Sequence, residues 1–171
     1  MRPRTLLLLA VLLACGCRQP PDDVHAAVRG VGGSAEADGD RPGRPGVTVD
    51  GHGSDVSDGW LARLEGLGQL RQLNLAATPI TDAGLTHLRG LTELRGLNLA
   101  GTRITDAGLA NLSGLTNLEE LGLAGTGVTD AGLAHLKGLK RLARLNAFGT
   151  KVTEAGERGL KEALPAVEVQ R

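Results

Sequence analysis

Four acidic residues recur at a fixed interval and are the first side chains that could do chemistry together. They are Asp82, Asp106, Asp130 and Glu154, spaced 24 residues apart, each directly after a threonine. If each interval is one turn of a coil, the carboxylates form a column with a spacing of about 5 Å, which a calcium ion could bridge. The helix dipole explains the same residues without a metal, if each lies in the first turn of a helix. We favour the helix and predict no metal site and no cofactor.

Other groups with catalytic potential stand apart from one another. His87 and His135 occupy the same place in their intervals as Asn111, so we expect them to be solvated. No serine has a recognisable base beside it, and no nucleophile-elbow, phosphate-loop or zinc-protease motif is present. The sequence therefore predicts a protein that is not an enzyme. Basic and acidic residues both number 19, without a long basic stripe, so we expect no nucleic-acid partner.

The two cysteines, Cys15 and Cys17, end a short apolar run near two arginines. This is the layout of a secretory signal peptide. The sequence L-L-A-C ending at Cys15 resembles the lipobox of bacterial lipoproteins, and A-C-G-C ending at Cys17 fits less well. The resemblance implies that one of the two thiols is lipidated and holds the exported protein on a membrane of the cell envelope. An ordinary signal peptide, giving a secreted or periplasmic protein, is the alternative.

The sequence divides into three parts. Residues 1–17 are the signal peptide with its lipobox-like cleavage region, and residues 47–171 are the folded domain. Residues 18–46 are rich in Gly and Pro and lack a sustained apolar period, so they cannot bury enough surface to offset their ordering entropy. We predict a flexible tether there.

The acidic residues must be positioned by the 24-residue repeat that contains them. Four units begin at Leu70, Leu94, Leu118 and Leu142, each opening with L-x-x-L-x-L or a close variant. Alternate leucines such as Leu97 and Leu99 share one face of a strand. A threonine then turns into the core and binds loop backbone (Thr78, Thr102, Thr126 and Thr150). With one Phe, one Trp and no Tyr, the core must consist of stacked aliphatic columns.

A short helix is expected in the second half of each unit. The motif T-D-A-G-L places a threonine at the helix N-cap (Thr81, Thr105, Thr129 and Thr153). Glycines follow where a left-handed C-cap belongs (Gly66, Gly90, Gly114 and Gly138). Each unit is therefore predicted as strand, turn, short helix and loop.

The terminal units differ from the others. A degenerate first unit is expected before Leu70, with a strand at Val47 and Val49. Trp60 replaces the glycine of later units, which we attribute to the absence of a preceding helix, and should cover the open end of the core. At the other end, residues 164–169 restore the strand pattern and should form the closing strand.

These repeats, written L-x-x-L-x-L-x-x-T-x-I-T-D-A-G-L-x-x-L, resemble those of bacterial leucine-rich-repeat proteins over residues 70–169. The resemblance implies an α/β solenoid with a short parallel sheet on the concave face and short helices on the convex face. It also implies recognition of a protein or ligand, commonly through the concave face.

The outward strand positions are the candidate binding surface. Arg144 and Phe148 are the residues there that suit a binding hot spot, with Glu120, Asn98 and Asn146 beside them. We predict a monomeric, non-enzymatic interaction module for an unidentified protein or envelope component. The alternative is a structural spacer of the envelope with no specific ligand, which suits the small polar residues of this face.

Overall fold

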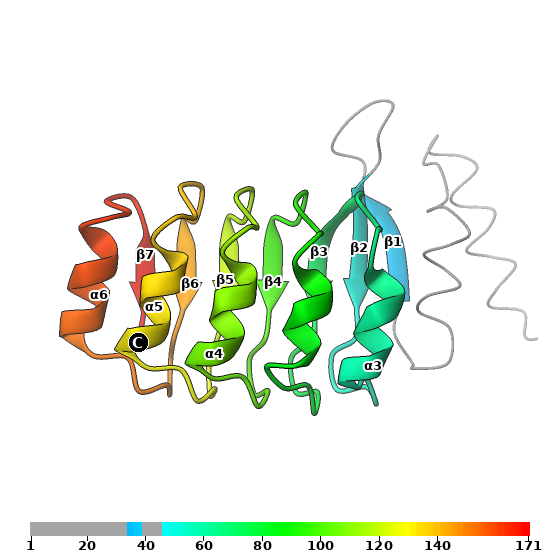
Figure 1. The fold of residues 1–171 in the computed structure, drawn as a ribbon, viewed down its shortest axis with the longest axis horizontal. Helices are drawn as coiled ribbons and strands as arrows, with labels where there is room; N and C mark the ends of the chain where they lie inside the picture. The colour runs from blue at the N-terminus through cyan, green and yellow to red at the C-terminus, as the bar shows by residue number, and fades with distance from the viewer. Residues whose placement is uncertain (1–33, 39–45) are drawn as a thin grey trace, which may run out of the picture.

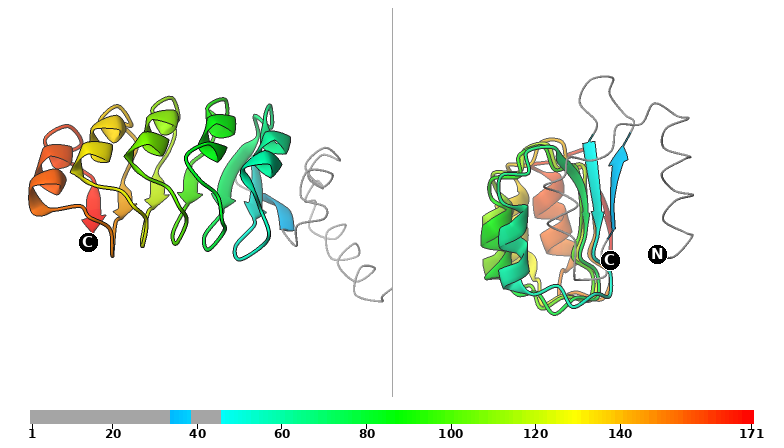
Figure 2. Two further views of the ribbon diagram at one scale, coloured as in Figure 1. Left: turned by 60° about the horizontal axis from the view of Figure 1, so that its bottom comes forward. Right: turned by 90° about the vertical axis from the view of Figure 1, so that its right-hand side faces the viewer.

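The computed structural model describes residues 34–38 and 46–171. Its strands are β1 (Ser34–Asp38), β2 (Gly46–Asp50), β3 (Leu70–Asn74), β4 (Gly96–Asn98), β5 (Glu120–Gly122), β6 (Arg144–Asn146) and β7 (Glu168–Gln170). Its helices are α3 (Asp58–Leu61), α4 (Asp106–Leu109), α5 (Asp130–Leu133) and α6 (Glu154–Lys161), with 3-10 helices η1 (Ala62–Leu64), η2 (Gly84–Leu88), η3 (Ala110–Leu112) and η4 (Ala134–Leu136). Strands and helices alternate along a row, with the helices on one face of the sheet (Figures 1 and 2).

The sheet follows the order of the chain from β1 to β7, and β2 to β7 are parallel. Leu97 pairs with Leu121, and Leu121 pairs with Leu145. A spacing of 24 residues therefore advances the chain by one strand. This register confirms the stacked coil that the sequence predicts.

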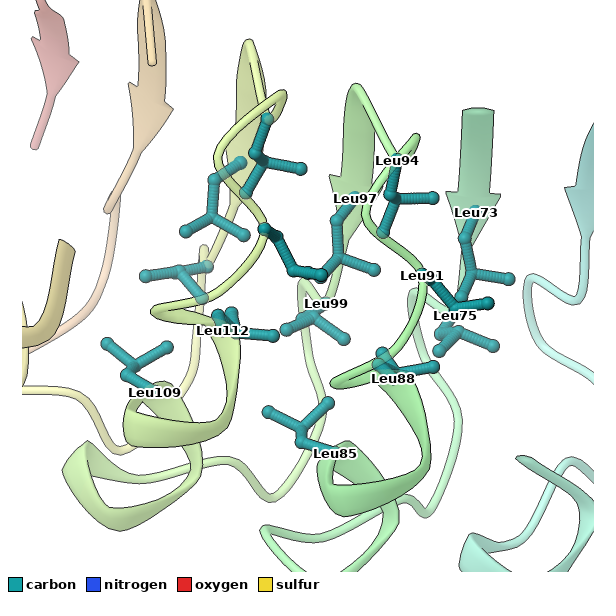
Figure 3. Packing of buried hydrophobic residues seen from close by; sticks show 14 of the residues in the cluster. Leu73, Leu75, Leu85, Leu88, Leu91, Leu94, Leu97, Leu99, Leu109 and Leu112 are labelled. Carbon is teal, nitrogen blue, oxygen red and sulfur yellow. The ribbon is translucent and has the colours of Figure 1, made fainter. Parts of the chain in front are cut away.

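The core is a set of leucine columns between the sheet and the helices. Leu99, Leu123 and Leu109 are fully buried, and Leu97 is only 2% exposed. Leucines from neighbouring strands, helices and loops interlock across the units (Figure 3). Burial of one such side chain contributes about 1.5–3 kcal/mol, and no unit has a second layer of its own to bury it against.

The threonines after the strands hold the turn into each loop. The Oγ1 atoms of Thr78, Thr102, Thr126 and Thr150 each donate to the backbone carbonyl three residues earlier, at 2.6 Å. Thr78, Thr102 and Thr126 are buried. The prediction that these hydroxyls bind loop backbone is confirmed, and each bond lies within its own unit.

The prediction of left-handed glycines at the helix ends is wrong for three of the four. Of the four predicted C-cap glycines, only Gly66 has a positive φ, of 79°. The helices instead run into 3-10 turns whose last residues stay right-handed, as at Ser113 and Lys137. The left-handed residues lie in the loops after the strands, at Gly101, Gly125, Gly149 and Ala77, with φ from 56° to 69°.

Replacing Ala77 by glycine is expected to stabilise the protein by about 0.5–1 kcal/mol. The left-handed conformation costs an alanine about 1–2 kcal/mol, and this exceeds the extra entropy that a glycine loses on folding. Ala77 is exposed and has a φ of 56°, so no packing is lost. Urea denaturation measures the change.

The converse substitution, Gly125→Ala, is the matched control. A Cβ at Gly125 has no neighbour nearer than 3.9 Å, so only the backbone conformation opposes it. It should destabilise the protein by about 1 kcal/mol. Equal stability of both variants and the natural chain would contradict this account of the loop.

The ends of the stack are closed in different ways. Val47 and Val49 lie in β2 and are fully buried, which confirms the degenerate first unit. Trp60 is 7% exposed and belongs to the core. Within the predicted tether, residues 34–38 form β1, antiparallel to β2, so the prediction of a flexible spacer is wrong for these residues. The N–H and C=O groups at the edge of β2 can pair with a segment such as β1 even when that segment has no apolar pattern.

At the far end, α6 is the longest helix of the described chain, and β7 pairs with β6. Leu164 and Val167 are buried below it. A closing strand is present, but it spans Glu168–Gln170, and residues 164–167 of the predicted strand form a turn. Arg171 follows β7 and contacts the carboxylate of Glu157 at 2.6 Å.

Candidate functional site

The face of the sheet that lies away from the helices carries two rows of outward side chains. Parallel register places Gln72, Gly96, Glu120, Arg144 and Glu168 in one row. Asp50, Asn74, Asn98, Gly122, Asn146 and Gln170 form the second row. These residues line a hollow of about 530 Å³, here called the groove.

The groove is polar because the strand leucines point to the other side. Leu73, Leu97 and Leu121 border it, yet each is only 2% exposed. No apolar anchor therefore reaches the groove from its floor, and its chemistry is that of amides, carboxylates and one guanidinium.

Arg144 and Glu120, both expected at the binding surface, are neighbours in the first row. The Arg144 guanidinium donates to Glu120 Oε1, and the two form an ion pair. Both side chains are about half exposed or more, at 62% and 49%. The ion pair neutralises the one cation of the groove.

Asn98 and Asn146 have a structural role that the sequence reading missed. Their Oδ1 atoms accept from the backbone N–H two residues later, from Ala100 at 3.1 Å and from Phe148 at 3.0 Å. The side chains thus hold the ends of β4 and β6, as Asn side chains do in Asx turns. With Oδ1 engaged, the Nδ2 groups are the parts of these amides that can serve a ligand as donors.

Phe148 is 68% exposed, the large hydrophobic side chain that the described part of the chain leaves in solvent. It lies two residues beyond β6 and is not among the residues that line the groove. The structure thus brings Arg144, Glu120, Asn98 and Asn146 together and leaves Phe148 outside the groove, in the loop that follows β6.

The acidic column has an explanation in the hydrogen bonds between units. Asp82 Oδ1 accepts from the backbone N–H of Thr105 at 2.8 Å, and Asp82 Oδ2 accepts from its hydroxyl at 2.6 Å. The same two bonds join Asp58 to Thr81, Asp106 to Thr129 and Asp130 to Thr153. We call this series the Asp–Thr ladder. Each carboxylate binds the threonine of the next T-D-A-G-L motif or its Glu variant. Thr105, Thr129 and Thr153 are the N-caps of α4, α5 and α6, whereas Thr81 lies three residues before η2, whose N-cap is Ala83.

The ladder also explains the glycines of the T-D-A-G-L motif. A Cβ at Gly84, Gly108, Gly132 or Gly156 would overlap the carboxylate of the preceding aspartate. Trp60 occupies this place in the first described unit, whose helix α3 has no helix before it in the described part of the chain. The glycine was attributed to a preceding helix, and the group of that helix that approaches it is the aspartate side chain.

The last acidic residue, Glu154, binds no threonine of a later unit in the described residues. Glu154 is 79% exposed and lies 3.6 Å from Arg171. Over residues 34–38 and 46–171, no three His, Cys, Asp or Glu side chains gather as a metal site requires. His87 is partly exposed, and its Nδ1 lies 2.5 Å from Oε1 of the exposed Glu65.

Two carboxyl pKa values are lowered at the last unit. The hydroxyl and then the N–H of Thr153 lower the pKa of Asp130 below its ordinary 3.8, against a smaller effect of burial. The pKa of Glu157 is lowered first by the Lys161 hydrogen bond and then by that of Arg171.

Acid is therefore expected to remove the stability that the Asp130 bonds provide. A pKa that is lower in the folded state than in the unfolded state favours folding above about pH 4 and ceases to do so as pH falls through the folded value. The difference in unfolding free energy between the natural chain and Asp130→Ala should be constant above about pH 5 and shrink below about pH 4. Urea titrations at a series of pH values measure it.

Glu154→Ala is the control, because it removes a carboxylate from the same place in the repeat without breaking a ladder bond. Its stability should stay within about 0.5 kcal/mol of the natural chain. A difference for Asp130→Ala that persists unchanged into strong acid would mean that its charge contributes nothing.

Cys15 and Cys17 lie outside the described residues. Among the residues that are described, no helix has the length and apolar character to cross a membrane.

Comparison with known proteins supports the architecture. The family model described as Leucine Rich repeat matches residues 91–113, which include strand β4, helix α4 and the 3-10 helix η3. An internalin from Listeria monocytogenes superposes with a TM-score of 0.56 at 24% identity, over 64% of this chain and 30% of that one. The chain folds as a leucine-rich-repeat solenoid.

A leucine-rich-repeat protein of Leptospira interrogans gives a TM-score of 0.52 at 19% identity, over 64% of this chain. The solenoid spans less than a third of either structure, since it covers 27% of the Leptospira protein. No curated protein matches the sequence. The likeness concerns the fold, and the function must be argued from the solenoid's own surface.

Proposed function

We propose that this leucine-rich-repeat solenoid is a non-enzymatic recognition module that binds another protein through the groove and the adjacent Arg144 and Phe148. The observation that carries the proposal is the 530 Å³ groove across the open face of the sheet. Solenoids use such extended surfaces to bind partners. Phe148, exposed in the loop after β6, adds an aromatic contact of the kind that dominates binding energy.

A pull-down from envelope extract, with the full-length chain as bait, tests recognition. One specific partner should be retained by the natural chain and reduced at least tenfold by Arg144→Ala or Phe148→Ala. Arg158→Ala, an exposed arginine on α6, is the matched control and should retain the partner. Absence of any partner would favour the alternative, a structural spacer of the envelope.

We further propose that the protein is exported and held on a membrane by lipid on Cys15 or Cys17. The proposal rests on the apolar run and the lipobox-like residues before each cysteine. Acyl chains would place the groove at the membrane surface, where partners of the envelope lie within reach. Mass spectrometry of the mature N-terminus tests this. An unmodified Cys15 and Cys17 in the membrane fraction would contradict it.

A further inference from the structure

The groove carries a net negative charge, because its acidic side chains outnumber its basic ones. Its charged side chains are Asp50, Glu120, Glu168 and Arg144. Arg144 is paired with Glu120. Asp50 and Glu168 thus remain as carboxylates without a cationic partner in the described part of the chain.

The two carboxylates lie at opposite ends of the groove, and that of Asp50 is held by hydrogen bonds. Asp50 ends β2, and its Oδ1 accepts from Asn74 Nδ2 and from the His52 N–H, each at 3.0 Å. Glu168 begins β7, beside Arg144 in the register. The donors to Asp50 are neutral, so its charge remains for a ligand.

The separation of the two carboxylates sets the length of a ligand that reaches both. Asp50 and Glu168 stand on the first and last of six parallel strands. Five steps of about 4.8 Å between neighbouring strands give about 24 Å. An extended peptide rises about 3.4 Å per residue, so two residues seven positions apart span the same distance.

The groove between the ends suits a peptide main chain. The Nδ2 groups of Asn98 and Asn146 can donate to peptide carbonyls, since their Oδ1 atoms already accept backbone N–H groups. The floor offers no exposed leucine to anchor the apolar face of a helix. Charge and polarity both favour an extended basic segment over an amphipathic helix.

We propose that the groove binds an extended peptide segment with two cationic side chains about seven residues apart, which pair with Asp50 and Glu168. The proposal rests on the proposed recognition function and specifies its ligand. Arg144 lies one strand from Glu168 and is paired with Glu120, so it disfavours a further cation next to the residue that pairs with Glu168.

The probe is the peptide Lys-Gly-Ser-Gly-Ser-Gly-Ser-Lys with a neutral fluorophore, titrated with the full-length chain at low salt and followed by fluorescence anisotropy. It should bind about tenfold more tightly than the same peptide with Glu at both ends. It should also bind about fivefold more tightly than Lys-Gly-Ser-Lys, whose lysines cannot reach both carboxylates. Physiological salt should weaken binding, as expected for exposed charges.

The variants Asp50→Asn and Glu168→Gln should each weaken the long lysine peptide about fivefold, whereas Glu154→Gln on the helix side should not. Equal binding of the lysine and glutamate peptides, or unchanged affinity in both groove variants, would overturn the proposal. If the pull-down still yields a partner that depends on Arg144, recognition stands and only the ligand chemistry is wrong. If the peptide binds as expected and the extract yields no partner, the groove chemistry stands and the envelope partner is in doubt.

Discussion

Replacing Gly108 by alanine is expected to lower the free energy of unfolding by about 2 kcal/mol, although alanine is the better helix former by about 1 kcal/mol. The new Cβ would overlap Asp82 Oδ1 and lie 3.1 Å from Ile104 Cγ2. The carboxylate must move, and both of its bonds to Thr105 are then lost. Bonds to a charged group contribute about 1.5–3 kcal/mol each, so their loss exceeds the gain in propensity. Urea denaturation measures the net change.

A double-mutant cycle separates the collision from other effects of the substitution. In an Asp82→Ala background the carboxylate is absent, and Gly108→Ala should become neutral or stabilising. Gly90→Ala is the control, because a Cβ there meets nothing within 4 Å and its φ is not positive. Additive effects of the two substitutions would show that the glycine is not there to admit the aspartate.

Replacing Leu121 by alanine is expected to cost about 3 kcal/mol, within the range for buried leucines. Leu121 is 2% exposed and lies in register between Leu97 and Leu145. The cavity would therefore remove contacts on both sides of one unit, and a rigid stack of strands can collapse into it only in part. Equilibrium denaturation in urea measures the loss.

Two substitutions calibrate this expectation. Val169→Ala on the closing strand is partly buried and has a neighbouring strand on one side only in the described chain, so its cost should be smaller. Phe148→Ala removes an exposed ring and should change stability by less than about 0.5 kcal/mol. A cost for Leu121→Ala no larger than that for Val169→Ala would contradict a continuous core. A stable Phe148→Ala also shows that the binding variant is folded.

The columns could be predicted from the sequence because the period alone sets the register. Leu97, Leu121 and Leu145 are 24 residues apart and occupy matched positions. The same reasoning placed Arg144 beside Glu120 on the open face. Repetition converts a local pattern into long-range contacts, which an ordinary globular sequence does not allow.

The contacts that depend on side-chain direction could not be predicted in this way. The sequence places Asp82 at the start of a helix, but not the reach of its carboxylate to Thr105 in the next unit. One signal was present, since Asp gives way to Glu154 in the unit with no successor. The Asn98 turn was missed because residue type does not give the direction of a side chain. The charges of Asp50 and Glu168 were missed because these residues lie on the terminal strands, outside the regular units.

Two predictions about the backbone were wrong, those for the ends of the helices and for residues 34–38, because neither conformation is determined by the residue pattern that was used. Glycine follows each helix, as in a left-handed C-cap, but the helices end in right-handed 3-10 turns that any residue adopts. The Gly-Thr pair that follows β4, β5 and β6, as at Gly101, was the stronger signal for a left-handed residue. Strand β1 escaped prediction because pairing at a sheet edge uses main-chain groups and requires no apolar period.

The Asp–Thr ladder gives every pair of neighbouring units the same contact, so these contacts are interchangeable. Asp58, Asp82, Asp106 and Asp130 each meet an identical pair of donors one unit ahead, so any joint can replace any other. Excision of residues 94–117 would bring Asp82 opposite Thr129 and rebuild the same joint. Excision of 23 residues would instead shift the register by one residue, and the threonine hydroxyl after the deletion would no longer face the aspartate carboxylate before it. The length of this domain can therefore change only by whole turns.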